Sequence, residues 1–90
     1  MGTIAARQCA AVVRNFETVV AIELLVAAQA LDFRRPLGFG RGTAIAHKLL
    51  RERVKHLDAD RDLSIDIAAA LELVRSGELV AAVEREIGAL

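Results

Sequence analysis

The chain has 90 residues, of which 54% are hydrophobic and 27% charged, and its 12 basic residues balance 12 acidic ones. A net charge of zero disfavours the partners that attract basic proteins, so we expect neither nucleic acid nor an anionic membrane surface as a partner. The apolar content excludes intrinsic disorder, and a single cysteine, Cys9, excludes both a disulfide framework and a multi-cysteine zinc site within one chain.

Targeting and membrane signals are missing from the sequence. Residues 1–7 lack the basic and then apolar order of a signal peptide. The most apolar stretch, 18–31, contains Glu23 and Gln29 and is shorter than the roughly 20 residues that a membrane-spanning helix needs. We therefore predict a cytoplasmic protein with no membrane segment, in which Cys9 is a reduced thiol.

A long helix is predicted from Thr3 to Leu31, because this stretch contains neither proline nor glycine and is rich in good helix formers. Thr3 is the expected N-cap. The helix is expected to stop before Pro36, since a proline disfavours helical backbone at the residue that precedes it. At 1.5 Å per residue the helix would be about 45 Å long.

Residues 36–42 contain three glycines and are predicted to form a connector. Thr43 is the expected cap of the next helix, Ser64 caps the one after it, and Ser76 and Gly77 mark its end. The three shorter helices predicted in this way span 44–57, 65–76 and 78–87. This order predicts an all-α fold, with residues 1–90 forming a single helical domain in which a long first helix and three shorter helices pack as a bundle.

The first helix is more hydrophobic than a small monomer can cover, because its apolar side chains point almost all the way around the helical wheel. Three short helices cannot enclose a rod of about 45 Å. We therefore expect further copies of the chain, in a homo-oligomer, or another chain to cover it. The alternative is a three-helix sandwich in which much of the alanine-rich surface is simply exposed. The predicted interface residues are Val12, Phe16, Val19, Val20, Leu24 and Leu25.

Two motifs suggest ligand binding but lack essential parts. The aspartates of segment 58–66 have the spacing of EF-hand calcium ligands, yet Leu63 replaces the turn glycine and Ala69 replaces the bidentate glutamate. We interpret the segment as a helix-capping turn in which Arg61 or Arg53 pairs with an aspartate. The glycines of the connector follow a helix rather than a strand, so a phosphate-binding loop is not predicted.

The remaining reactive side chains do not form a catalytic set in the sequence. On one helix, His47 and His56 would point to opposite sides, so we expect two surface histidines and no shared metal ion. We expect Glu17 and Glu23 to pair with an arginine on a neighbouring helix. Cys9 is expected to be a small core or interface residue. We predict no catalytic, cofactor-binding or metal-binding residue in this chain.

The segment 19–34, VVAIELLVAAQALDFR, resembles the VLAIELLAAAQGLDFR stretch of the histidine ammonia-lyases and related aromatic amino acid lyases. Residues 50–54 look like the LREKVP of that family, segment 58–67 looks like its YDRDRxxxPDI, and residues 72–77 resemble its AELLxSG. The first three residues look like those that follow the EDHVS motif of the family. The resemblance therefore covers nearly the whole chain, with departures at Ala30, Lys55 and Ser64.

The resemblance implies the non-oxidative deamination of L-histidine to urocanate and ammonia, or a similar reaction on another aromatic amino acid. In the family the electrophile is a methylidene-imidazolone formed from an Ala-Ser-Gly triad, and an active-site tyrosine is also needed. This chain contains no Ala-Ser-Gly and no tyrosine. The resemblance thus predicts the C-terminal helical assembly segment of a lyase, inactive alone and without a cofactor of its own.

Two alternatives remain open from the sequence. The chain could be a stand-alone oligomerisation or protein-binding module derived from a lyase, or the C-terminal half of a split lyase that joins a separately encoded N-terminal part. In the family, long helices from four subunits build a central bundle, so the resemblance also implies partners that cover the first helix.

Overall fold

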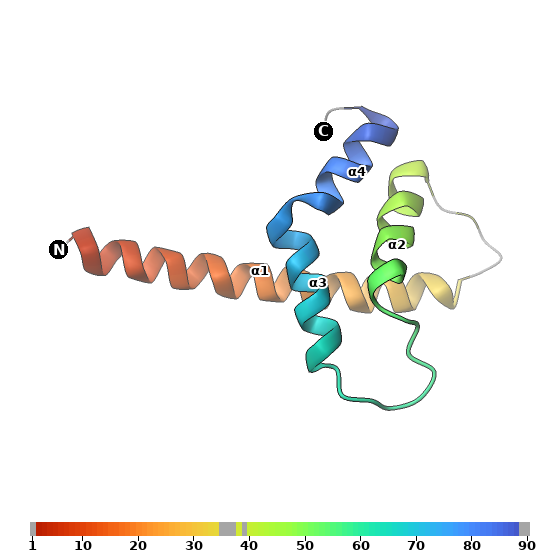
Figure 1. The fold of residues 1–90 in the computed structure, drawn as a ribbon, viewed down its shortest axis with the longest axis horizontal. Coiled ribbons are helices and arrows are strands. Elements are labelled where there is room, and N and C mark those ends of the chain that lie inside the picture. The colour runs from red at the N-terminus through yellow and green to blue at the C-terminus, as the bar shows by residue number, and fades with distance from the viewer. Residues whose placement is uncertain (1, 35–37, 39, 89–90) are drawn as a thin grey trace.

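The computed structural model describes residues 2–34, 38 and 40–88. Four helices lie in this part of the chain: α1 (Gly2–Asp32), α2 (Arg41–Arg53), α3 (Ser64–Ser76) and α4 (Glu78–Ile87). All of the regular secondary structure among the described residues is helical, which confirms the predicted all-α class (Figure 1). No helix of the described residues is long and apolar enough to cross a membrane.

Helix α1 has the predicted length, but its N-terminus differs. Thr3 lies inside the helix, which already includes Gly2, so Thr3 cannot be the N-cap. The helix ends at Asp32, one residue later than predicted. An uninterrupted run of helix formers explains both the length and the absence of a break near Thr3.

Helix α2 begins and ends earlier than the sequence predicts. Its first residue is Arg41, so Arg41 and Gly42 belong to the helix and not to the connector, of which residues 36, 37 and 39 lie outside the described residues. Thr43 is therefore not the cap, and Gly40 precedes the helix without a side-chain cap. A Cβ atom at Gly42 would lie 3.4 Å from Ile87 Cδ1, which is an ordinary van der Waals contact, so Gly42 lies beside α4.

Helices α3 and α4 follow the prediction closely. Gly77 has a φ of 77°, a left-handed conformation that ends α3 and that glycine adopts without strain. Ser64 is the first residue of α3 rather than its cap, since Leu63 is the N-cap and makes no side-chain capping hydrogen bond. The Oδ1 atom of Asp62 accepts a hydrogen bond of 2.9 Å from the Ser64 backbone N–H.

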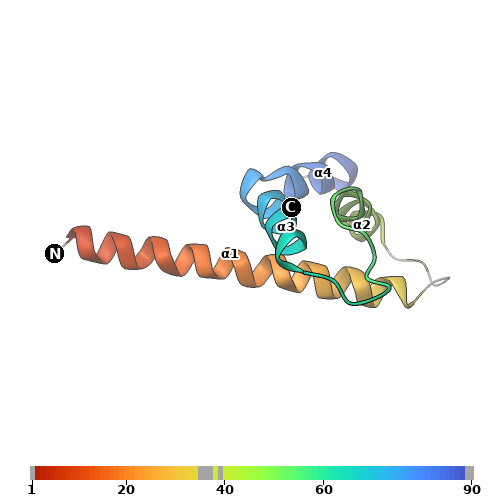
Figure 2. The ribbon, with the colours of Figure 1, turned by 60° about the horizontal axis from the view of Figure 1, so that its bottom comes forward.

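The core lies where α3 crosses the second half of α1. Alanines on both helices allow this close approach, and α4 packs mainly on α2. The buried apolar residues are Ala21, Ala28, Leu50, Val54, Ala70 and Leu73. Figure 2 shows α2, α3 and α4 on one side of α1, and the N-terminal half of α1 projects beyond them (Figure 1).

The projecting helix makes the chain more extended than a compact monomer. The radius of gyration is 15.2 Å, whereas about 12 Å is expected for a compact domain of this length. The accessible surface is 6430 Å², whereas about 5,100 Å² is expected for a monomer of this mass. The difference of about 1,300 Å² is surface that a folded monomer of this size normally covers.

Candidate functional site

The most densely connected polar group of the described residues is Asp32, at the C-terminal end of α1. Its Oδ1 atom accepts a hydrogen bond from His47 Nε2 at 2.6 Å, and its Oδ2 atom accepts one from His56 Nδ1 at 2.6 Å. Arg51 donates to the same Oδ2 atom through Nε at 3.1 Å and through a terminal nitrogen at 2.7 Å. We call Asp32, His47, Arg51 and His56 the carboxylate cluster.

Gln29, one turn before Asp32, forms hydrogen bonds with the segment that follows α2. Its amide nitrogen donates to the Leu57 carbonyl at 2.9 Å, and its amide oxygen accepts from the Leu57 backbone N–H at 3.1 Å. The same amide nitrogen lies 3.3 Å from His56 Nε2. A neutral His56 that carries its proton on Nδ1 satisfies both of these contacts, because Nδ1 then donates to Asp32 and Nε2 accepts from Gln29.

The electrostatics of the cluster hold Asp32 in its charged form. Burial raises the pKa of Asp32, but the hydrogen bonds from His56, Arg51 and His47 and the charge of Arg51 together hold this pKa well below its ordinary value of 3.8. A general base works best when its pKa lies near the operating pH, which is not the case for Asp32. Both oxygens of this carboxylate also accept hydrogen bonds from residues of the same chain. The cluster is therefore suited to joining α1, α2 and the following segment, rather than to proton transfer.

This low pKa predicts acid sensitivity. The native pKa of Asp32 lies below the ordinary value of 3.8, so as the pH falls the unfolded chain binds the proton first. We expect the free energy of unfolding to decline as the pH is lowered through about 4, measured as urea midpoints between about pH 6 and about pH 3. Asp32→Asn should flatten this decline. An equally steep decline in that variant would contradict the assignment.

The two histidines do not lie as the sequence predicts. Helix α2 ends at Arg53, where Val54 is extended, so His56 lies on the segment that returns toward α1 instead of on the helix. Both histidines contact one carboxylate, and His47 is buried, with 7% of its surface exposed. The prediction of two surface histidines on opposite sides is therefore wrong. Among the described residues no group of three His, Cys, Asp or Glu side chains is arranged to hold a metal ion.

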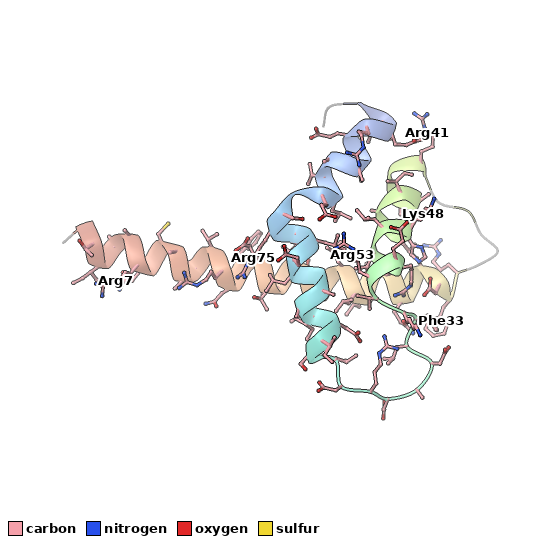
Figure 3. All side chains as sticks on the ribbon, in the orientation of Figure 1. Arg7, Phe33, Arg41, Lys48, Arg53 and Arg75 are labelled. Atoms are coloured by element: carbon pink, nitrogen blue, oxygen red, sulfur yellow. The ribbon has the colours of Figure 1, made fainter. Side chains whose placement is uncertain are left out.

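Sequence reasoning missed the carboxylate cluster because Asp32 looked only like a helix end. One signal was present, since His47 and Arg51 are four residues apart and therefore share a face of α2. The hydrogen bonds from His47 and His56 to Asp32 join residues that are 15 and 24 positions apart in the sequence, so they depend on how the helices pack. Phe33, next to Asp32, adds an edge-to-face contact to His56 with ring centroids 5.6 Å apart (Figure 3).

Other predicted pairs are confirmed in part. Glu17 pairs with Arg75 of α3 at 3.5 Å, as expected for a glutamate on α1, and Figure 3 shows Arg75 beside that helix. Arg61 pairs with Asp66 at 2.9 Å, as predicted, whereas Arg53 pairs with Glu78 of α4 instead. Cys9 is exposed on α1, so it is not a core residue of this chain.

The predicted interface residues divide into two groups. Val12, Phe16 and Val19 are exposed, with 66%, 68% and 50% of their surface accessible. Leu24 and Leu25 instead pack against the core of the same chain, and Val20 is partly buried. Among the described residues, exposed apolar side chains therefore lie along both halves of α1, from Ile4 to Val26.

The second half of α1 borders an apolar groove of about 420 Å³. It is lined by α1 residues that include Ile22, Val26 and Ala30, and by residues of the segment after α2 and the start of α3, such as Leu57 and Ile67. The exposed apolar face of α1 thus continues from the projecting half into this groove.

Comparison with known proteins identifies the family. The profile of the aromatic amino acid lyases matches residues 1–52. The histidine ammonia-lyase of Natranaerobius thermophilus is 49% identical over all 90 residues, and that of Symbiobacterium thermophilum is 52% identical over all 90. This chain belongs to the aromatic amino acid lyase family. The histidine ammonia-lyase of Sorangium cellulosum, 50% identical over the whole chain, agrees with this conclusion.

The chain spans only 18% of the length of these three relatives. No solved structure matches it. Its similarity to the histidine ammonia-lyases extends over the carboxylate cluster and the whole of α1, because the alignments include every residue of the chain.

Proposed function

We propose that the chain is the C-terminal helical assembly segment of a histidine ammonia-lyase, and that it acts in the cytoplasm as part of that enzyme. The enzyme would deaminate L-histidine to urocanate and ammonia. Two facts support this role: identities of 49% to 52% over all 90 residues, and a length that is 18% of these relatives. In this role α1 contributes a face on which other parts of the enzyme assemble.

We further propose that the segment is inactive alone. The sequence has neither the Ala-Ser-Gly triad from which the family forms its electrophile nor a tyrosine. In the carboxylate cluster, both oxygens of Asp32 accept hydrogen bonds from His47, Arg51 and His56 of the same chain. Catalytic groups would therefore come from the remaining part of the lyase.

The observation that carries the assembly role is the uncovered apolar face of α1. Val12, Phe16 and Val26 each expose between 64% and 68% of their surface on one helix. An apolar patch of this extent is typical of a surface that another protein surface covers. The surplus of about 1,300 Å² over a compact monomer exceeds the roughly 800 Å² that each partner buries in a standard interface.

A complementation experiment tests this function. The matching segment is deleted from the Symbiobacterium thermophilum histidine ammonia-lyase, and the truncated enzyme is produced with and without this chain. We expect no urocanate, followed by its near-ultraviolet absorbance, from either piece alone, and recovery of activity and of the native oligomer mass when both are present. The pair of proteins is 52% identical over the exchanged segment, so the exchanged surfaces are closely related.

Each alternative has its own outcome. Urocanate formation by the isolated chain would overturn the proposed inactivity. A truncated enzyme that keeps its activity and its oligomer mass would overturn the assembly role. Detection of a protein of this chain's own size in the source cells, by an antibody on a denaturing gel, would favour the split enzyme or the stand-alone module over a segment of a longer lyase.

A further inference from the structure

His56 lies where the segment after α2 returns to α1, and its two ring nitrogens face different partners. Nδ1 donates to Asp32 Oδ2 at 2.6 Å. Nε2 lies between two groups, the amide nitrogen of Gln29 at 3.3 Å and the Oδ1 atom of Asp58 at 3.6 Å. The amide nitrogen can only donate to Nε2, whereas the carboxylate can only accept from it. The partner of Nε2 therefore depends on whether this nitrogen carries a proton.

The Gln29 amide cannot turn over to suit a protonated ring. Its oxygen accepts from the Leu57 backbone N–H at 3.1 Å, and its nitrogen donates to the Leu57 carbonyl at 2.9 Å. After a turn, donor would face donor and acceptor would face acceptor at Leu57. A proton on Nε2 of His56 is therefore repelled by an N–H group of Gln29. The side chain of Asp58 is 89% exposed, so it is free to move closer and accept this proton in a hydrogen bond.

Only one neutral form of the His56 ring fits its surroundings. With the proton on Nε2 alone, the lone pair of Nδ1 would point at the Asp32 carboxylate across 2.6 Å. Asp32 stays charged, because the carboxylate cluster holds its pKa well below the ordinary value. The edge-to-face contact with Phe33 also restrains the plane of the ring. Nδ1 therefore keeps its proton in both charge states, and only Nε2 gains or loses one.

Charged and titratable groups face His56 from every element that packs against it. These groups are Asp32 on α1, His47 and Arg51 on α2, Asp58 and Arg61 on the segment after α2, and Asp66 on α3. Carboxylates attract a charged ring, whereas Arg51 repels it, and the charges of Arg61 and Asp66 offset each other at 2.9 Å. The ring is 32% exposed beside a polar hollow of about 310 Å³, so protons exchange with solvent there.

We propose that His56 is a pH switch on the segment that follows α2. At low pH the charged ring donates from Nε2 to Asp58. As the pH rises, Nε2 gives this proton to water and accepts a hydrogen bond from Gln29 instead. Gln29 then binds His56 and both backbone groups of Leu57 at once, so its contact with Leu57 is firmer at high pH. Leu57 lines the apolar groove, so the switch acts on one side of that groove, and it does not rest on the proposed assembly function.

Nuclear magnetic resonance of the wild-type chain at a series of pH values tests the switch. The nitrogen-15 shifts of an imidazole show which ring nitrogen carries a proton. For His56 we expect a proton on Nδ1 throughout, and a proton on Nε2 that is lost within the range of about pH 5 to about pH 8 in which histidines ordinarily change charge. The protection of the Leu57 N–H against hydrogen exchange, corrected for the intrinsic rate at each pH, should rise about five-fold over the same range, as for one hydrogen bond gained.

A neutral His56 ring with its proton on Nε2 would overturn the proposal, and so would protection of Leu57 that does not change with pH. These wild-type spectra decide the question even where a variant fails to fold.

A matched pair of variants assigns the effect to one histidine. His56→Asn keeps an N–H group for Asp32 but has no counterpart of Nε2, so the protection of Leu57 should no longer change with pH. His47→Gln keeps an N–H group for Asp32 and removes the other histidine, so the change with pH should remain. The reverse result, with the change kept in His56→Asn and lost in His47→Gln, would contradict the assignment to His56.

Discussion

Replacing Asp32 by asparagine is expected to lower the free energy of unfolding by about 3 kcal/mol, the size of effect seen when one member of a buried ion pair is removed. The side chain of Asp32 is 14% exposed and accepts from three residues, so the neutral amide leaves Arg51 without its partner charge. An asparagine also presents an N–H₂ group to one of the donors that the carboxylate accepted. The measurement is urea unfolding followed by far-ultraviolet circular dichroism near neutral pH.

Asp60→Asn is the matched control, because Asp60 is exposed and undergoes the same chemical change. Its free energy of unfolding should stay within about 0.5 kcal/mol of the wild type. If the two variants are equally stable, the carboxylate cluster does not hold α2 and the segment after it against α1. Because assembly with other chains adds stability by mass action, both variants must be compared at one chain concentration.

Replacing Phe16 by aspartate is expected to dissociate the assembly without unfolding the chain. Phe16 is 68% exposed and lies on the projecting half of α1, so the new charge meets water in the monomer. In the assembly the same charge would enter an apolar seam, at a cost of about 3 kcal/mol, which corresponds to about a 100-fold weaker association. Sedimentation or light scattering over a range of concentrations measures the change.

Ala10→Asp adds the same charge to the same half of α1, on the side away from Val12 and Phe16, where Ala10 is exposed. It should leave the association constant nearly unchanged. Equal weakening by both variants would mean that this half of α1 acts through its overall charge and not through its apolar face. Leu24→Asp is expected to behave differently from Phe16→Asp, because Leu24 packs against the core and its replacement would unfold the chain.

The positions of the helices could be predicted from the sequence because their signals are local. A run without proline or glycine specified α1 to within one residue at each end, and Gly77 separated α3 from α4 at the expected position. Less of α2 was predicted. Gly42 looks like part of a loop in the sequence, yet it lies in the first turn of α2, where a Cβ atom would make ordinary van der Waals contacts with Ile87 and Val83 of α4.

The sequence by itself determined the all-helical class, the family, and the excess of apolar side chains on the first helix. Only the tertiary structure decided which of those side chains remain uncovered. Ala21 and Ala28 are buried in the core and Leu24 packs against it, whereas Phe16 is exposed to solvent. The tertiary structure likewise decided that His47 and His56 meet at Asp32. Periodicity fixes the face of a helix on which a residue lies, whereas the neighbour of that face depends on contacts between segments that are far apart in the chain.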